Sequence, residues 1–339
     1  MEDVSRRSKA LTPAVPKTQA EKRLKGGIQM KDKLSIVYDM TLRCPWDCPI
    51  CCMGAKTEQS ACRQELSFDQ KLEVIDKIAE ATQLRDIRVD FSGGEIFTDL
   101  RNVEVIEYAA RLLGQDRIGI SSSGFRIDDE MALRLSKCIS ECEMTMDTAP
   151  GQPYPLRPMG YAIAAAKAAP FLKKHGISTG IQTVLARSNC REDILRNVYK
   201  WVCQEGIDCW SLLKFYPSGR GAAYPHEKLD PDQEVWAVRF IQQLDEANPS
   251  PDKPKVDFHY TMKGHPKHSD ECRCVKKSIG IMPDGSVTSC FWAVDANTGI
   301  IAPKFKLGNL REQSLTDIIS GAAAKYWLCC SHHCELTAA

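Results

Sequence analysis

Cys44-Pro-Trp-Asp-Cys48-Pro-Ile-Cys51 is the stretch that decides the fold and the chemistry expected of this chain. It follows residues 34–40, whose composition predicts a β-strand. A second predicted strand, 87–91, is followed by Ser92-Gly-Gly-Glu95. In parallel α/β folds, ligands bind beyond the carboxyl ends of the strands. We therefore expect the cysteine loop and the Gly-Gly-Glu segment to lie at the same end of a sheet.

Strand and helix patterns alternate along the chain after this point, which indicates right-handed crossovers and a parallel sheet. About 200 residues of alternation fit an incomplete barrel better than an eight-fold barrel, which takes about 250. We predict an α/β fold, a partial (β/α)6 TIM-like barrel, with an open doubly wound sheet as the alternative. The expected strands are 34–40, 87–91, 117–122, 143–147, 177–185 and 208–215, and the expected helices are 67–81, 102–113, 129–137, 161–174, 191–204 and 232–246.

Composition narrows the class of protein. The 339 residues carry 45 basic and 44 acidic side chains, a net charge of +1, so no nucleic-acid partner is expected. No apolar run approaches the roughly 20 residues that span a bilayer, so no membrane partner is expected either. Residues 1–31 are polar and contain no apolar segment of the kind a secretory signal needs, which predicts a flexible tail and a cytoplasmic location. Glu2, Asp3 and Glu21 argue against a mitochondrial presequence.

The 16 cysteines are the unusual feature of the composition. Without a secretory signal, thiolates that hold a metal are expected rather than disulfides. Most cysteines gather in two regions, 44–62 and 272–334. Five others lie singly in apolar segments and are interpreted as small buried side chains: Cys138, Cys142, Cys190, Cys203 and Cys209.

Three cysteines in one short loop suit an iron–sulfur cluster. A structural zinc site usually takes four protein ligands, often in two separated pairs, and remains the alternative. Cys44, Cys48 and Cys51 fit three corners of a [4Fe–4S] cube and leave the fourth iron open to a small molecule. Cys52 could be a fourth ligand, but adjacent cysteines rarely both reach one cube, so we assign it to packing or to the neighbourhood of the substrate.

With Gly93-Gly94-Glu95 after the next strand, the three-cysteine loop resembles that of the radical S-adenosylmethionine (SAM) superfamily. The resemblance covers about residues 34–220. It implies that the methionine part of SAM chelates the open iron, and that an electron then splits the sulfonium. The resulting 5′-deoxyadenosyl radical abstracts a hydrogen atom from the substrate. An electron donor such as flavodoxin or ferredoxin is implied as a partner.

The resemblance also suggests cosubstrate contacts, each of which has a purely structural alternative. Gly93, Gly94 and Glu95 would meet the methionine amino group. Other candidates lie at the ends of the third and fourth predicted strands or within the fifth. Arg220 lies in a Pro-Ser-Gly-Arg turn that resembles one common in the superfamily. Arg220 is expected to bind the cosubstrate carboxylate or a substrate anion. The remaining candidates are Ser122, Ser123, Asp147 and Gln182.

The second group of cysteines follows a change in character near residue 250. Cys274, ten residues, Gly285, four residues and Cys290 resemble the opening of the auxiliary-cluster extension called SPASM, or twitch when shortened. Residues 279–292 predict a hairpin that turns at Asp284-Gly285, and about 314–326 predict a helix. Too few cysteines follow Cys290 for two clusters, so one auxiliary [4Fe–4S] cluster is implied, with zinc as the alternative. Its expected ligands are Cys274, Cys290, Cys334 and either Cys329 or Cys330, with Cys272 as a spare and His332 and His333 less favoured.

The expected organisation is a tail, 1–31, a radical SAM partial barrel, 32–250, and an auxiliary-cluster extension, 251–339. The favoured reaction is carbon-centred modification of a ribosomal peptide. Oxidation, epimerisation or rearrangement of a small molecule such as a sugar, cyclitol or nucleoside is the alternative, and a non-catalytic metal-binding scaffold is the alternative of another class. An epimerisation would need a thiol that returns hydrogen, for which the candidates are Cys52, Cys62 and Cys209.

Overall fold

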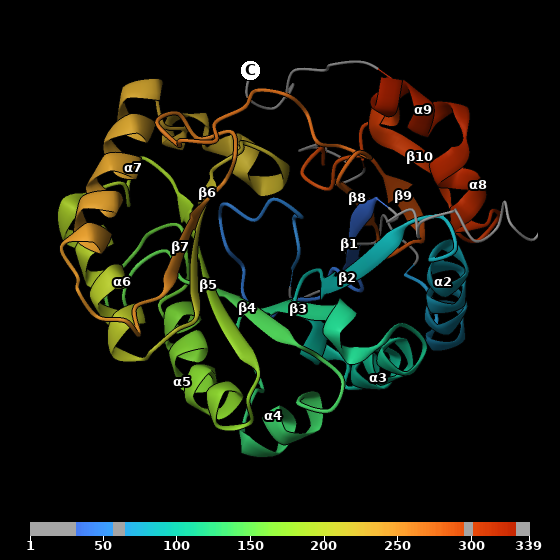
Figure 1. Ribbon diagram of the computed structural model, residues 1–339, viewed down its shortest axis with the longest axis horizontal. Coiled ribbons are helices and arrows are strands. Elements are labelled where there is room, and N and C mark those ends of the chain that lie inside the picture. Colours follow the sequence, from blue (N-terminus) through green and yellow to red (C-terminus); the bar gives the residue numbers. More distant parts are fainter. Residues whose placement is uncertain (1–31, 57–64, 295–300, 330–339) are drawn as a thin grey trace, which may run out of the picture. The chain divides into compact units, whose positions relative to one another are not determined.

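A computed structural model describes residues 32–56, 65–294 and 301–329 (Figure 1). Its strands form one sheet in the order β10-β9-β8-β1-β2-β3-β4-β5-β6-β7. The strands that follow one another from β1 to β7 are all parallel. Their bounds are β1 Lys33–Asp39, β2 Asp86–Ser92, β3 Ile118–Ser122, β4 Glu141–Thr145, β5 Ser178–Leu185, β6 Cys209–Lys214 and β7 Lys255–Phe258.

Sequential strand order makes this a barrel-type sheet and excludes the doubly wound alternative, which needs a reversal of order. Right-handed crossovers then place the helices on one face, and Figure 1 shows them outside the arc of strands. In the part of the chain that the structure describes, β7 and β10 are the edges and do not pair, so the barrel is partial, as predicted. The helices are α2 Phe68–Ala81, α3 Arg101–Leu113, α4 Asp129–Leu135, α5 Gly160–Lys174, α6 Glu192–Gln204 and α7 Pro231–Glu246.

The alternation of side chains along β1 explains how the sheet serves both a core and a site. Leu34, Ile36 and Tyr38 are buried at 0–1% exposure in the apolar layer under the helices. Val37 and Asp39 point the other way and line an interior cavity. Because side chains alternate between the two faces of a strand, each barrel strand contributes to the core and to the cavity at once.

The C-terminal extension continues the same sheet on the far side of β1. Strand β8 (Ser278–Ile281) pairs parallel with β1, and β9 (Ser286–Thr288) and β10 (Lys306–Asn309) follow antiparallel. The predicted hairpin is therefore confirmed, with Gly285 at φ +83° in its turn. The helix expected over 314–326 is two helices, α8 (Leu315–Ser320) and α9 (Ala322–Cys329), separated at Gly321.

Strand β7 also differs from the expected organisation, which places residues 255–258 in the extension. Instead they pair with β6 and lengthen the barrel sheet. No helix among the described residues is long and apolar enough to cross a membrane.

Candidate active site

A cavity of about 370 Å³ opens at the carboxyl-terminal halves of the barrel strands. The cysteine loop forms one wall, and residues 92–94, residues 121–123, Glu143 and Thr145 form others. Phe291 and Trp292, from the extension, also line it. Both sequence motifs thus lie at the same end of the sheet, as predicted.

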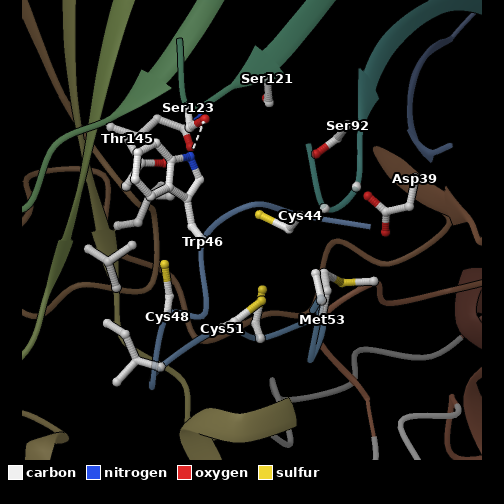
Figure 2. Close-up of a pocket in the computed structure, with 18 of the residues that line it drawn as sticks. Asp39, Cys44, Trp46, Cys48, Cys51, Met53, Ser92, Ser121, Ser123 and Thr145 are labelled. Atoms are coloured by element: carbon white, nitrogen blue, oxygen red, sulfur yellow. Dashed lines mark hydrogen bonds between the residues drawn. The ribbon is translucent and has the colours of Figure 1, made fainter. Parts of the chain in front are cut away.

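The three cysteines of the loop converge on this cavity. Figure 2 shows the sulfur atoms of Cys44, Cys48 and Cys51 directed toward one space beside Trp46. Burial raises the pKa of the Cys44 thiol to about 12, and the charges of Glu95 and the neighbouring thiols add to the effect. Such a site favours neutral thiols until a metal deprotonates them. Among the described residues, no group of three histidine, cysteine, aspartate or glutamate side chains is close enough together to hold a single metal ion. A polynuclear cluster spreads its ligands more widely, and three thiols around one space fit it.

Two glycines allow the segment after β2 to pack against the start of the cysteine loop. A Cβ on Gly93, whose φ is +131°, would lie 2.5 Å from the Thr41 carbonyl oxygen, and one on Gly94 would lie 2.2 Å from that of Arg43. The Gly94 and Glu95 amides donate to these same two oxygens, at 2.7 and 2.8 Å. The glycines therefore position the cysteine loop, while their backbone lines the cavity.

Glu95 does not line the cavity within the described structure. Its carboxylate is fully buried and accepts bonds from the Ser122 hydroxyl at 3.0 Å and the Ser123 amide at 2.8 Å. Burial raises the pKa of Glu95, although the bonds from Ser123 oppose that rise. Glu95 thus joins the end of β2 to the end of β3. Ser122 and Ser123 do line the cavity.

Trp46 extends this network to the loop, because its indole Nε1 donates to the Ser123 hydroxyl at 2.7 Å (Figure 2). Its ring meets Tyr161 edge-on, with ring centroids 5.6 Å apart. The indole is held between two elements and covers one side of the cysteine site.

Sequence reasoning missed Arg157, which lies in the cavity wall between β4 and α5. Its Nε is 2.6 Å from a carboxylate oxygen of Asp147, whose side chain is fully buried. Asp147 also accepts the Val184 amide at 2.8 Å. Asp147, a predicted cosubstrate contact, therefore orients the arginine and does not itself line the cavity. No motif marks Arg157, since only its Asp147 partner lies at the end of a predicted strand.

Deeper in the cavity, Gln182 donates its side-chain amide to the Glu143 carboxylate. Burial, and then the charges of Asp90 and Glu141, raises the pKa of Glu143 to about 7. Both residues also line a second cavity of about 380 Å³ that reaches Arg273. Gln182 faces the interior as predicted, and the Glu143 it binds was not anticipated.

The remaining site residues predicted from the sequence differ in whether they line the cavity. Cys52 lines the cavity beside Cys51. Cys209, at the start of β6, lines neither cavity and is 3.6 Å from the Ser211 hydroxyl, so it does not reach the site described here. Arg220 binds carbonyl groups of the cysteine loop and does not line the cavity. Cys62 lies outside the described residues.

Of the second group of cysteines, the structure describes Cys272, Cys274 and Cys290. The Cys274 thiol is hydrogen-bonded to both Cys272 and Cys290, which raises its pKa. Cys272, expected only as a spare, therefore lies with the two predicted ligands. Cys330, Cys334, His332 and His333 are outside the described residues, as is the side chain of Cys329.

Two family models match the chain. The radical SAM superfamily model matches residues 38–196, and the iron–sulfur cluster-binding SPASM domain matches residues 272–335. The chain belongs to the radical SAM superfamily and carries a SPASM domain. It is an enzyme whose cofactors are SAM, a [4Fe–4S] cluster and an auxiliary iron–sulfur cluster.

Individual relatives agree with this class. The chain is similar to the PqqA peptide cyclase of Granulibacter bethesdensis, with 26% identity over 86% of this chain and 75% of the relative. Its fold resembles anSMEcpe with bound SAM, at a TM-score of 0.64 and 15% identity over 87% of this chain and 82% of that one. It also resembles Streptococcus suis SuiB bound to the precursor peptide SuiA, at a TM-score of 0.66 and 14% identity over 86% of this chain and 65% of that one.

Proposed function

We propose that this enzyme makes a carbon-centred modification in a ribosomally made peptide. The observation that carries the proposal is the similarity to a PqqA peptide cyclase, which extends over 86% of the chain. A fold like that of SuiB with its precursor peptide agrees with it. The reduced cluster, when present, supplies the electron that cleaves SAM to methionine and a 5′-deoxyadenosyl radical.

The chain's own residues would prepare this step. Cys44, Cys48 and Cys51 would hold the cluster, because all three line one cavity wall. Arg157 and Lys214 are cations of the cavity wall, and Lys214 is paired with Glu234. We therefore assign the methionine carboxylate to Arg157, because Asp147 accepts from its Nε and the two terminal nitrogens of the guanidinium can donate to a second carboxylate. The backbone of Gly93 and Gly94 and the hydroxyls of Ser122 and Ser123 would provide neutral polar contacts.

The auxiliary cluster would be held by Cys272, Cys274 and Cys290, with a fourth ligand from Cys329, Cys330 or Cys334. Phe291 and Trp292 follow Cys290 directly and line the main cavity. The auxiliary site is thus next in sequence to the wall that a substrate would touch, which suits a role in accepting an electron from it. Flavodoxin or ferredoxin is the electron donor we propose for the first cluster.

The decisive experiment uses a short peptide encoded beside the gene, with the anaerobically reconstituted enzyme, SAM and a reductant. We expect 5′-deoxyadenosine together with a peptide whose mass falls by about two hydrogens per turnover, as for a cross-link or an unsaturation. Loss of the mass change in a Cys48→Ala variant is the control. Formation of 5′-deoxyadenosine without any change in such peptides would count against the proposal.

A small-molecule substrate is the second candidate. The second cavity, of about 380 Å³, shares Glu143 and Gln182 with the cavity assigned to SAM and is in the size range of small-ligand sites, which favours this candidate. Modification of a sugar, cyclitol or nucleoside, with no effect of peptides on 5′-deoxyadenosine formation, would establish this candidate.

A further inference from the structure

The turn that follows β6 packs directly against the cysteine loop. Gly219 has φ +51°, and a Cβ there would lie 2.2 Å from the Cys52 carbonyl oxygen. The next backbone amide, that of Arg220, donates to the Cys51 carbonyl oxygen at 3.0 Å. This contact joins residues far apart in sequence, and only a glycine allows the approach.

The Arg220 side chain continues the contact around the outside of the loop. Its Nε and Nη2 both donate to the Cys48 carbonyl oxygen, at 2.9 and 2.7 Å. Its Nη1 donates to the Ala55 carbonyl oxygen at 2.5 Å and lies 3.3 Å from the Asp47 carboxylate. One guanidinium therefore binds both halves of the loop, before and after Cys51.

This geometry leaves Arg220 poorly placed to bind a carboxylate of the cosubstrate. All three of its nitrogens donate to the loop, and its side chain is outside the cavity lining. Arg157 is the arginine that lines the cavity. The expectation that Arg220 binds a cosubstrate or substrate anion is therefore replaced by a different role.

We propose that Arg220 is a positioning residue that holds the loop from Cys44 to Ala55 in the shape that receives the cluster. Charge-assisted hydrogen bonds to its carbonyl groups already restrict the loop in the apo-protein. The loop therefore loses less conformational entropy when the cluster binds. The inference rests on the assignment of Cys44, Cys48 and Cys51 as ligands and does not depend on the substrate.

Two variants separate the shape of the guanidinium from its charge. Arg220→Lys keeps the charge but cannot reach the Cys48 and Ala55 carbonyls together, and Arg220→Met removes both properties. Arg187→Met is the matched control, because Arg187 donates to the His226 carbonyl oxygen at 3.1 Å and to that of Lys228 at 3.4 Å, outside the cysteine loop. Thermal unfolding of each apo-protein identifies any variant that fails to fold.

The first measurement is amide hydrogen exchange of residues 44–56 in the full-length apo-protein. The second is the rate at which a chelator removes the cluster whose electron paramagnetic resonance signal responds to SAM. We expect both Arg220 variants to exchange faster and to lose this cluster about tenfold faster than wild type or Arg187→Met, the effect of losing one charge-assisted hydrogen bond. With Arg220→Lys, the KM for SAM per intact cluster should stay near the wild-type value.

Two results would overturn the proposal. One is unchanged exchange and unchanged cluster loss in Arg220→Lys and Arg220→Met. The other is a large rise in the KM for SAM while the cluster is retained, which would return Arg220 to the cosubstrate site. No peptide is present in these assays, so they can fail or succeed independently of the proposed peptide substrate.

Discussion

Arg157 and Arg220 both lie beside the cysteine loop and bind different partners. Arg157 lines the cavity and pairs with the buried Asp147 carboxylate at 2.6 Å. Arg220 faces the loop's carbonyl oxygens. Sequence reasoning favoured Arg220 because its turn resembles a family motif. What decides between the two arginines is tertiary contact, which a motif does not contain.

For Arg157, we predict that Arg157→Lys weakens SAM binding and leaves the cluster in place. Lysine keeps the positive charge and can still reach Asp147, but it loses the planar fork that can bind two carboxylates at once. The KM for SAM in 5′-deoxyadenosine formation should rise about tenfold, equivalent to about 1.4 kcal/mol. A KM equal to that of wild type would show that another group binds the methionine carboxylate.

A second prediction at this scale concerns the pH dependence of stability. The folded-state pKa of Glu143, about 7, is above its usual value of 4.5, so the folded chain holds a proton that the unfolded chain releases. This contribution to stability is complete below about pH 4.5 and is lost as the pH rises to about 7. Glu143→Gln should remove about 2 kcal/mol of the decline between pH 5 and 8.

Urea unfolding at several pH values under anaerobic conditions measures this effect. Burial also raises the pKa of Asp90, to about 6, so part of the decline should persist in Glu143→Gln. A variant whose stability falls with pH as steeply as that of wild type would show that Glu143 is not the titrating group.

At the scale of elements, β6 and α7 are joined by a buried ion pair. Lys214 Nζ lies 2.6 Å from a carboxylate oxygen of Glu234, and their side chains are 7% and 2% exposed. The other Glu234 oxygen accepts the Lys263 amide at 2.9 Å. Removing one partner of such a pair leaves a buried charge without its counter-ion, which costs more than the pair contributes.

We predict that Lys214→Met lowers the free energy of unfolding by about 3–5 kcal/mol. In Lys214→Met/Glu234→Gln the neutral amide can still accept the Lys263 amide, so most of the loss should be recovered. Lys174→Met is the comparison, because the Lys174–Asp129 pair is exposed and should contribute at most about 1 kcal/mol. A double variant as unstable as the single one would assign the loss to packing.

Elements with local signals were predicted well. The capping box of Ser67 and Gln70 marks the start of α2, and the Asp284-Gly285 turn marks the β8–β9 hairpin. The place of β7 could not be predicted locally, because it depends on pairing with β6. The pairing of β8 with β1 likewise depends on residues far apart in sequence. Of the site, the loop cysteines and the glycines could be predicted from spacing. The roles of Glu95, Arg157 and Arg220 depend on which backbone groups surround them.

At the scale of the whole molecule, one sheet connects the two cysteine regions. The SAM-cleaving loop follows the carboxyl end of β1. The backbone of Cys274 forms an isolated β-bridge with that of Ser278, the first residue of β8. Ser278 in turn pairs with Ser35, near the amino end of β1. The two regions therefore lie toward opposite ends of neighbouring strands, and each can bind its cluster without the ligands of the other.

This arrangement predicts independent loss of the two clusters. Reconstituted wild type should hold about eight irons per chain, and Cys272→Ala/Cys290→Ala about four. Since the loop cysteines are untouched, that variant should still form 5′-deoxyadenosine from SAM but should not complete turnover of the peptide. Cys44→Ala/Cys48→Ala should also retain about four irons and form no 5′-deoxyadenosine. Zinc in place of iron in Cys44→Ala/Cys48→Ala would identify the auxiliary site as structural. Loss of all iron in Cys272→Ala/Cys290→Ala would show that the two sites depend on each other.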